Sequence, residues 1–174
     1  MEKQTQVLAE EHKNILKVIS ALEWECGRLN SKKEIDKEFF AKAIDFIRNY
    51  ADKFHHAKEE DILFVEFCKN AHKTHCNPVD QMLYEHKLGR EFVKNMESAI
   101  KKDDSNGTLE NATGYANLLK EHIFKEDTIL YPMMDEVFDE KTQQSITERS
   151  AAAEKKFKKE DLERYLAFAN NLNN

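Results

Sequence analysis

Turn-forming residues are scarce in this sequence, which holds only 4 glycines and 2 prolines among 174 residues. Their scarcity predicts few turns and long secondary-structure elements. No apolar run reaches the length of a membrane span, and the N-terminal MEKQTQVLAEEHK lacks the apolar segment of a secretory signal. We therefore expect neither a membrane partner nor secretion.

Cysteine is also infrequent, and nothing suggests a disulfide framework. Cys26, Cys68 and Cys76 are an odd number without the spacing of such a framework. Reduced thiols in a cytoplasmic protein are the simplest interpretation. A basic stripe that would neutralise phosphates is missing as well, because the net charge is -6 and both signs are interspersed. We expect no nucleic-acid partner.

The residues that are present are typical of long amphipathic helices, with 34% charged and 40% hydrophobic residues in a length that suits one domain. Apolar residues recur at steps of three and four, which places them on one face of a helix. Four such series cover residues 8–26, 44–62, 79–100 and 115–133. The fourth series predicts that Ile129 points into the core. They predict an all-α protein, an up-down-up-down four-helix bundle over residues 1–140 with an additional C-terminal helical extension over 141–174 packed on the same domain.

The residues between the series predict where the helices end. The first helix is expected to end at 27–31, and the second to run from about 36 to about 70. A polar connection at 71–77 precedes a third helix with Pro78 in its first turn. A turn at 103–107 precedes the fourth helix, and the extension has helical stretches at 141–150 and 159–172.

Each of the four apolar stripes carries a histidine near its middle. These histidines are His12, His55, His86 and His122, and a glutamate follows two of them after four residues, at Glu59 and Glu126. Residues i and i+4 of a helix point the same way, so each His–Glu pair faces one place in the core. Burying an unpaired carboxylate is costly, and bound metal ions supply the compensating charge.

A single histidine on an apolar face is more often a core residue bonded to a carbonyl, and a buried ion network is a second structural explanation. Recurrence on four helices at comparable depth favours a metal site over both. The sequence also repeats itself, since 55–64 and 122–131 both read H-x-x-K-E-[ED]-x-I-L-[FY]. Lys58 and Lys125 are equivalent in this repeat and would either tune the carboxylates or lie in solvent. Asp45, Asn49 and Asp52, upstream on the face of His56, are expected to be solvated.

Four segments of the chain resemble the hemerythrin family, in particular its bacterial branch named for His-His-Glu cation binding. They are LAEEH at 8–12, FHHAKEEDILF at 54–64, MLYEHKLGR at 82–90, and HIFKE at 122–126 with the Tyr131-Pro132 pair. Together they span residues 8 to about 132. Their combination in this order is specific, whereas a single H-x-x-x-E motif would be weak.

The resemblance implies two non-haem iron ions joined by an oxo or hydroxo bridge. Glu59 and Glu126 would bridge the ions, and the terminal ligands would be His12, His55, His86 and His122. The oxygen carriers of the family have an H-x-x-x-H pair on the third helix, where this chain has Met82 and Arg90 around His86, so the adjacent His56 is a fifth imidazole candidate. Those carriers place an acid where Asp127 stands. Asp127 is off the inward series, so Glu126 is preferred, and Asp127 and Glu60 stay open as further ligands.

Several functions fit such a centre. Imidazole and carboxylate ligands also suit other divalent metals, and iron is chosen on the resemblance. Two carboxylates with up to five imidazoles carry less negative charge than carboxylate-rich di-iron oxidases. This favours reversible binding of a small diatomic ligand, oxygen or nitric oxide, for storage, delivery or sensing. The alternatives are a di-iron redox enzyme, peroxidase-like or nitric-oxide-handling, and an iron-homeostasis protein; no redox partner is identifiable.

Four further features of the sequence have candidate roles, and two of them have two interpretations. The residues Cys68, His72, His75 and Cys76 form either a second metal site or a solvated loop. Tyr84 and Tyr115 are candidate hydrogen-bond donors to an iron-bound ligand. Gly89 either permits close helix approach or leaves room beside the metals, and Arg90 is expected to pair with a carboxylate on a neighbouring helix.

Overall fold

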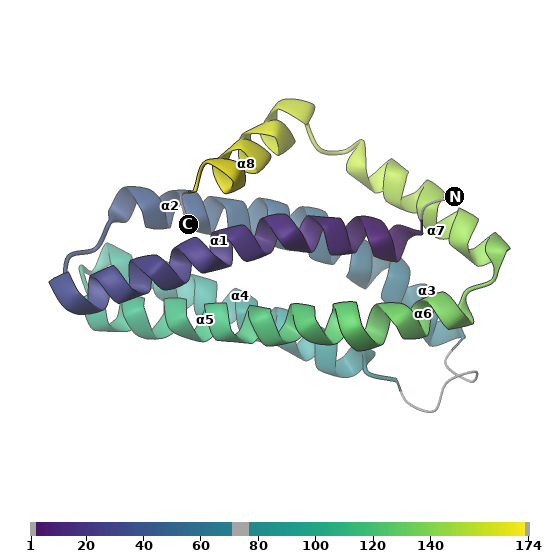
Figure 1. Ribbon diagram of the computed structural model, residues 1–174, viewed down its shortest axis with the longest axis horizontal. Helices are drawn as coiled ribbons and strands as arrows, with labels where there is room; N and C mark the ends of the chain where they lie inside the picture. The colour runs from purple at the N-terminus through teal and green to yellow at the C-terminus, as the bar shows by residue number, and fades with distance from the viewer. Residues whose placement is uncertain (1–2, 71–76, 173–174) are drawn as a thin grey trace.

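Every regular element in the described residues, 3–70 and 77–172 of this computed structural model, is helical (Figure 1). The first helix, α1 (Gln4–Lys32), continues through residues 27–31, so the expectation that it ends there was wrong. Its last residue is Lys32, and Lys33 caps it. Lys33 has a left-handed φ of 56°, and its N–H bonds to the carbonyl of Leu29. Nothing lies within 4 Å of a Cβ built at Gly27, so this glycine neither turns the chain nor relieves a clash.

The second long helix changes its hydrogen-bonding pattern along its length. It begins with α2 (Lys37–Phe46), continues through the π-helical segments η1 (Ile47–His56) and η2 (Glu59–Leu63), and ends with α3 (Phe64–Lys69). A π turn adds one residue because each N–H bonds to the carbonyl five residues back. The N–H of Phe64, for example, bonds to the carbonyl of Glu59. The expected polar connection lies outside the described residues, apart from Asn77.

The third and fourth long helices follow the predicted order. They are α4 (Val79–Lys101), then α5 (Ser105–Lys125), which continues as the π segment η4 (Glu126–Leu130) and as α6 (Tyr131–Val137). The expected turn at 103–107 is shorter than predicted, because Asp104 caps α5 by accepting from the N–H of Gly107. Pro132 has no N–H to give to a carbonyl four residues back, which favours the π turn that precedes it.

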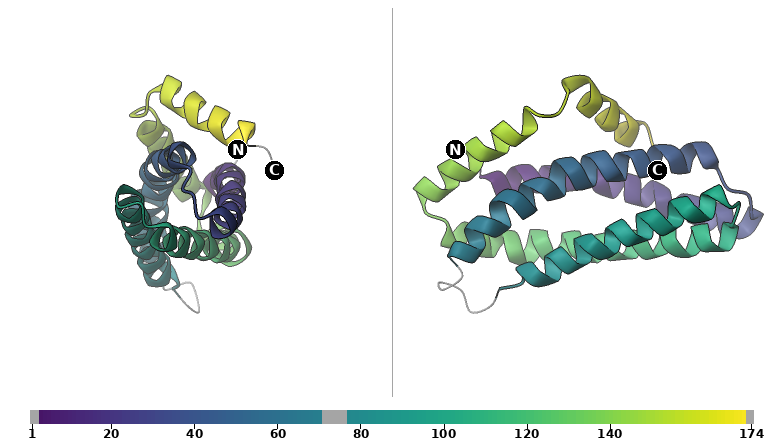
Figure 2. Two further views of the ribbon diagram at one scale, coloured as in Figure 1. Left: turned by 90° about the vertical axis from the view of Figure 1, so that its left-hand side faces the viewer. Right: turned by 180° about the vertical axis from the view of Figure 1, so that it is seen from behind.

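These helices form the predicted up-down-up-down bundle. Consecutive helices run in opposite directions (Figures 1 and 2). The bundle closes because α1 contacts both η1 and α5, while α4 contacts both α2 and α5. The extension forms α7 (Glu140–Glu154) and α8 (Lys159–Asn171); α7 contacts α1 and η2, and α8 contacts α1. Helix α7 is longer than expected, and the domain division at residue 140 stays a prediction.

A polar layer separates two apolar clusters inside the bundle. One cluster includes Ile15, Phe46, Val93 and Leu119, and the other includes Leu8, Ile62, Met82 and Leu130. The histidines and glutamates of the four stripes lie between these clusters, since His12, for instance, falls between Leu8 and Ile15 on α1. The clusters thus keep the polar layer away from both ends of the bundle.

One predicted inward residue faces solvent instead. Ile129 is 50% exposed, whereas its neighbour Leu130 is 1% exposed. The π turn of η4 adds one residue after Glu126 and moves the inward face one position along the chain. Within the described chain, no helix combines the length and apolarity needed to cross a membrane.

Candidate metal centre

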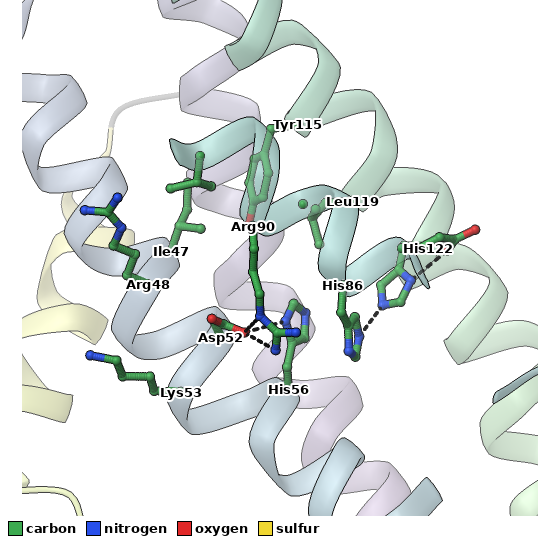
Figure 3. A pocket seen from close by; sticks show the side chains of 13 residues that line it. Ile47, Arg48, Asp52, Lys53, His56, His86, Arg90, Tyr115, Leu119 and His122 are labelled. Carbon is green, nitrogen blue, oxygen red and sulfur yellow. Dashed lines mark hydrogen bonds and ion pairs between the residues drawn. The ribbon is translucent and has the colours of Figure 1, made fainter. Parts of the chain in front are cut away.

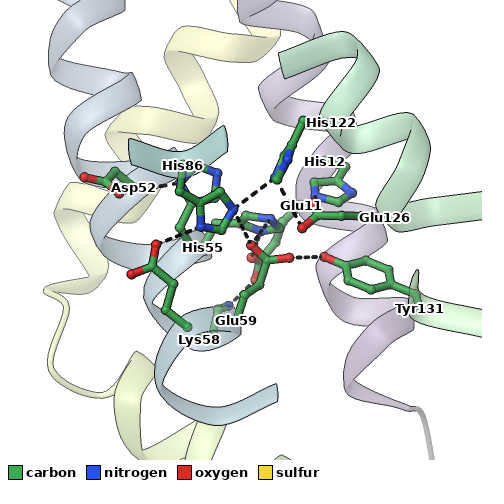
Figure 4. Close-up of polar contacts among 12 residues, drawn as sticks. Glu11, His12, Asp52, His55, Lys58, Glu59, His86, His122, Glu126 and Tyr131 are labelled. Atoms are coloured by element: carbon green, nitrogen blue, oxygen red, sulfur yellow. Dashed lines mark hydrogen bonds and ion pairs between the residues drawn. The ribbon is translucent and has the colours of Figure 1, made fainter. Parts of the chain in front are cut away.

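All seven predicted ligands are buried and lie together in the polar layer. Figure 4 labels six of them, all but His56. They form two groups, His12, His55, Glu59 and Glu126, and His56, Glu59, His86 and His122. Within each group, one donor atom from every residue lies within 4.8 Å of the others. Glu59 belongs to both groups, so the structure brings together two adjacent sites that share a carboxylate.

Each glutamate faces one histidine from either group. The two oxygens of Glu126 lie 3.3 Å from His12 Nε2 and 3.2 Å from His122 Nε2. Glu59 Oε2 lies 3.7 Å from His55 Nε2 and 3.5 Å from His86 Nε2. This is the arrangement that carboxylates bridging two cations need.

His56 joins the second group although it directly follows His55. Its ring stacks on that of His86 with centroids 3.8 Å apart and 15° between the planes. Both neighbours point inward from η1, where the wider π turn alters the angular spacing of side chains. The structure therefore supplies the fifth imidazole that the broken H-x-x-x-H pattern lacked.

Carboxylates hold the outer ring nitrogens of the histidines. The distances to Nδ1 are 2.8 Å for Asp127 on His12, 2.9 Å for Glu11 on His55, 2.7 Å for Glu60 on His86 and 2.8 Å for Glu85 on His122. Asp52 stands 3.5 Å from Nδ1 of His56. Because a carboxylate accepts, Nδ1 carries the hydrogen and Nε2 directs a lone pair at the centre. Asp127 and Glu60, left open by the sequence, hold histidines from outside the two groups.

The inward atoms fit a bound cation. Nε2 of His12 and His55, Oε2 of Glu59 and both side-chain oxygens of Glu126 are buried without a hydrogen-bond partner in the described residues. The Nε2 atoms of His86 and His122 face each other at 3.0 Å, and their lone pairs repel unless a proton or a cation lies between them. Such uncompensated polar atoms are costly in a protein core, and cations between them remove the cost.

Protons take part of the cation's role when no metal is bound. Burial opposes charge on His122, but Glu126 and Glu85 outweigh it and raise the pKa of His122 to about 10. Burial likewise opposes charge on His12, but its hydrogen bond to Asp127 and the nearby Glu126 carboxylate raise the pKa of His12 to about 9. Burial and the charge of Glu126 raise the pKa of Glu59 well above its ordinary value. The centre thus attracts positive charge, either as protons or as metal ions.

Cations form a third layer behind these carboxylates. Lys58 is 1% exposed and bonds to Glu11 and, at 2.9 Å, to Glu154 of α7. Its equivalent in the repeat, Lys125, bonds to Glu85. These lysines therefore contact the acids that hold His55 and His122, and not the shared glutamates.

Arg90 completes this third layer on the other side. It donates to Asp52 at 2.6 Å and to Glu60 at 2.7 Å, which confirms its expected pairing with a neighbouring helix. The expectation that Asp52 is solvated was wrong, because Arg90 and His56 hold it partly buried. Burial would raise the pKa of Asp52, but these two partners lower it to about 2.

Substitution of Lys58 by methionine is expected to weaken metal binding by up to about tenfold, less than the roughly 10- to 100-fold typical of losing the direct partner of a metal ligand, because Lys58 acts on His55 through Glu11. The variant leaves Glu11 without its ammonium partner, so His55 is less firmly oriented. Competition with a chromophoric chelator measures the affinity. Lys42→Met, on the exposed face of α2, is the matched control. Equal affinities in the two variants would contradict this role.

Sequence reasoning missed three residues of the network. Tyr131 donates to Glu59 Oε1 at 2.5 Å, and its ring lies parallel to that of His12. The repeat held a signal for it, since Tyr131 aligns with Phe64 and differs by the hydroxyl. Glu11 and Glu85 also went unnoticed, although each directly precedes a ligand histidine. Tyr84, a predicted hydrogen-bond donor to an iron-bound ligand, is 60% exposed and therefore lies outside the buried network.

The second candidate metal site falls mostly outside the described residues. His72, His75 and Cys76 are not described, and Cys68 is an exposed free thiol. Its two interpretations therefore stay predictions.

Comparisons with known proteins agree with this geometry. A search of curated proteins and a search of solved structures each returned no match. The family model described as "Hemerythrin HHE cation binding domain" matches residues 4–134, which include all seven predicted ligands. The chain accordingly belongs to the hemerythrin family of helical, cation-binding domains.

Proposed function

We propose that this chain binds two non-haem iron ions and, through them, a small diatomic ligand, oxygen or nitric oxide, for storage, delivery or sensing. The observation that carries the proposal is the position of Glu59 and Glu126 between the two groups. Each of these glutamates faces one histidine of the first group and one histidine of the second. Family membership supports iron among the metals that such ligands accept.

The residues of the chain have defined tasks in this proposal. His12 and His55 would hold one ion, while His56, His86 and His122 would hold the other. Glu59 and Glu126 would hold both ions and keep them close together. When bound, iron supplies the redox chemistry and the coordination position that a diatomic ligand needs.

Outer residues keep this ligand set in place. The carboxylates bonded to Nδ1 of four rings fix the orientation of those rings and raise their basicity. The hydroxyl of Tyr131 fixes one oxygen of Glu59 and leaves the other, Oε2, free of hydrogen bonds among the described residues. Burial and the charge of Glu59 raise the pKa of Tyr131, so its hydroxyl stays a donor.

The charge of the ligand set favours binding over oxidation. Two shared carboxylates with five imidazoles are less anionic than a carboxylate-rich site, and they stabilise high-valent iron less well. Reversible ligand binding is then favoured over attack on a substrate. A location in the cytoplasm belongs to the same proposal, as does an unidentified redox partner that would keep the iron reduced.

Metal analysis combined with absorption spectroscopy tests the proposal. We expect two irons per chain, a charge-transfer spectrum in air, and a band that forms on stopped-flow mixing of the reduced protein with oxygen and disappears when oxygen is removed. Irreversible oxidation without such a band would favour the redox-enzyme alternative. Folded protein that takes up no iron from an iron-rich medium would overturn the proposal.

A further inference from the structure

A cavity of about 290 Å³ adjoins the histidines of the second group (Figure 3). His56, His86 and His122 line one part of it. Its other walls include apolar side chains from three helices, Ile47 of η1, Val93 of α4 and Leu119 of α5. The cavity therefore connects the candidate metal centre with an apolar space inside the bundle.

This space is larger than a diatomic ligand needs. A dry cavity of about 150 Å³ accepts benzene, and this cavity has about twice that volume. Gly89 contributes to the space, because a Cβ added there would meet Leu119 and Tyr115 only at an ordinary 3.6 Å. Gly89 thus lies between the cavity and helix α5, which agrees with both interpretations of this glycine.

Tyr115 brings an unused hydrogen-bond donor to the cavity. Its side chain is 2% exposed, and its hydroxyl has no hydrogen-bond partner among the described residues. Figure 3 shows the ring pointing from α5 into the cavity, in the direction of Arg90. Burial and the charge of Asp52 raise the pKa of Tyr115, so the hydroxyl keeps its proton. A buried donor without an acceptor is costly, and a bound ligand with an acceptor would remove that cost.

The charges near the cavity do not select an anion. Arg48 bonds to Glu97 at 2.7 Å, and Arg90 bonds to Asp52 and Glu60. Lys53 lies at the exposed rim and contacts Asn49. The walls are partly apolar, both arginines are already paired with carboxylates, and the free hydrogen-bond donor is the neutral Tyr115 hydroxyl. These features favour a neutral ligand.

We propose that this cavity binds a small neutral organic molecule with a ring-sized apolar body and one hydrogen-bond acceptor, which the hydroxyl of Tyr115 holds. The apolar body lies among Ile47, Val93 and Leu119. This inference deepens the proposed function and rests on it only in placing the molecule beside bound metal. Binding itself depends on the cavity and on Tyr115.

Two isosteric probes test the assignment, cyclohexanone and methylenecyclohexane, which differ by an oxygen in place of a CH₂ group. Binding to the purified full-length protein is measured by titration followed by NMR. We expect Tyr115→Phe to lower the affinity for cyclohexanone about three- to tenfold, the usual contribution of one neutral hydrogen bond, and to leave the affinity for methylenecyclohexane unchanged. The metal content of this variant should also be unchanged. Tyr84→Phe, which alters an exposed tyrosine, should leave both affinities unchanged.

A second variant tests the location. Gly89→Leu fills part of the cavity and should abolish binding of both probes, and Val93→Phe replaces it if the leucine variant is less thermally stable. Lack of binding by both probes would overturn the inference, as would an affinity for cyclohexanone that Tyr115→Phe leaves unchanged or lowers no more than the affinity for methylenecyclohexane. Probe binding by a chain that takes up no metal would overturn the proposed function and leave this inference standing.

Discussion

Replacement of Glu126 by glutamine is expected to lower the proposed metal content from two ions per chain to one or none. Glutamine keeps the shape of the side chain but removes the charge that faces both His12 and His122. Losing an outer partner already costs about 10- to 100-fold in metal affinity, so losing a shared ligand should cost more than about 100-fold. Inductively coupled plasma analysis after dialysis measures the content.

Glu121→Gln is the matched control for this variant, because Glu121 lies exposed on the same helix, α5. It should keep full metal content. Circular dichroism must show both variants folded. A Glu126→Gln protein that retains two ions would mean that this carboxylate does not bind metal.

Removal of metal is expected to lower the melting temperature of the protein by about 10 °C. A ligand present at 1,000 times its dissociation constant stabilises the folded state by about 4 kcal/mol. For a chain of this size, each kcal/mol shifts the melting temperature by about 2–4 °C. Differential scanning calorimetry before and after chelation measures the shift. A melting temperature that chelation leaves unchanged would show that metal does not stabilise this core.

The metal-free protein should also lose stability as the pH rises. The folded-state pKa values of His12 and His122 are raised to about 9 and about 10, above the ordinary 6.5. Protonation of these rings therefore stabilises the fold fully below pH 6.5, and this contribution is lost as pH rises to about 10. The metal-loaded protein needs the same rings unprotonated and should not show this loss. A metal-free melting temperature that is constant between pH 7 and 10 would contradict these pKa shifts.

The seven residues of the candidate metal centre could be predicted because their chemistry conflicts with their position. A histidine or glutamate in the middle of an apolar stripe is visible in the sequence alone, and the repeat at 55–64 and 122–131 set the register of the two glutamates. The helices that carry these residues were predictable for a different reason, because apolar residues recur at helical spacing on both sides of them. The exception follows Glu126, where the inward position is Leu130 and not Ile129.

The outer network could not be predicted, since it depends on contacts between helices. Glu11 holds His55, and Glu85 holds His122, yet neither acid lies near its partner in sequence. The buried position of Lys58 depends on Glu154, which lies beyond the residues that resemble the family. The shift from Ile129 to Leu130 had another cause, because a π turn has no periodicity that marks it in advance.

The contacts around the centre repeat with approximate two-fold symmetry. Helices α1 and α4 each supply a Glu-His pair, and the repeat supplies His-x-x-Lys-Glu from the other two helices. His12 lies parallel to Tyr131 at 5.6 Å between centroids, as His86 lies close to parallel with Phe64 at 6.0 Å. Two substitutions break this symmetry: His56 has Ile123 as its counterpart, and Tyr131 has Phe64.

This imperfect symmetry makes the two halves electrically unequal. The half that includes His56 has an additional imidazole, while the other half has the phenol of Tyr131, which lies on the His12 ring and donates to Glu59. The duplicated framework thus builds two neighbouring positions, and its two exceptions make their surroundings unequal.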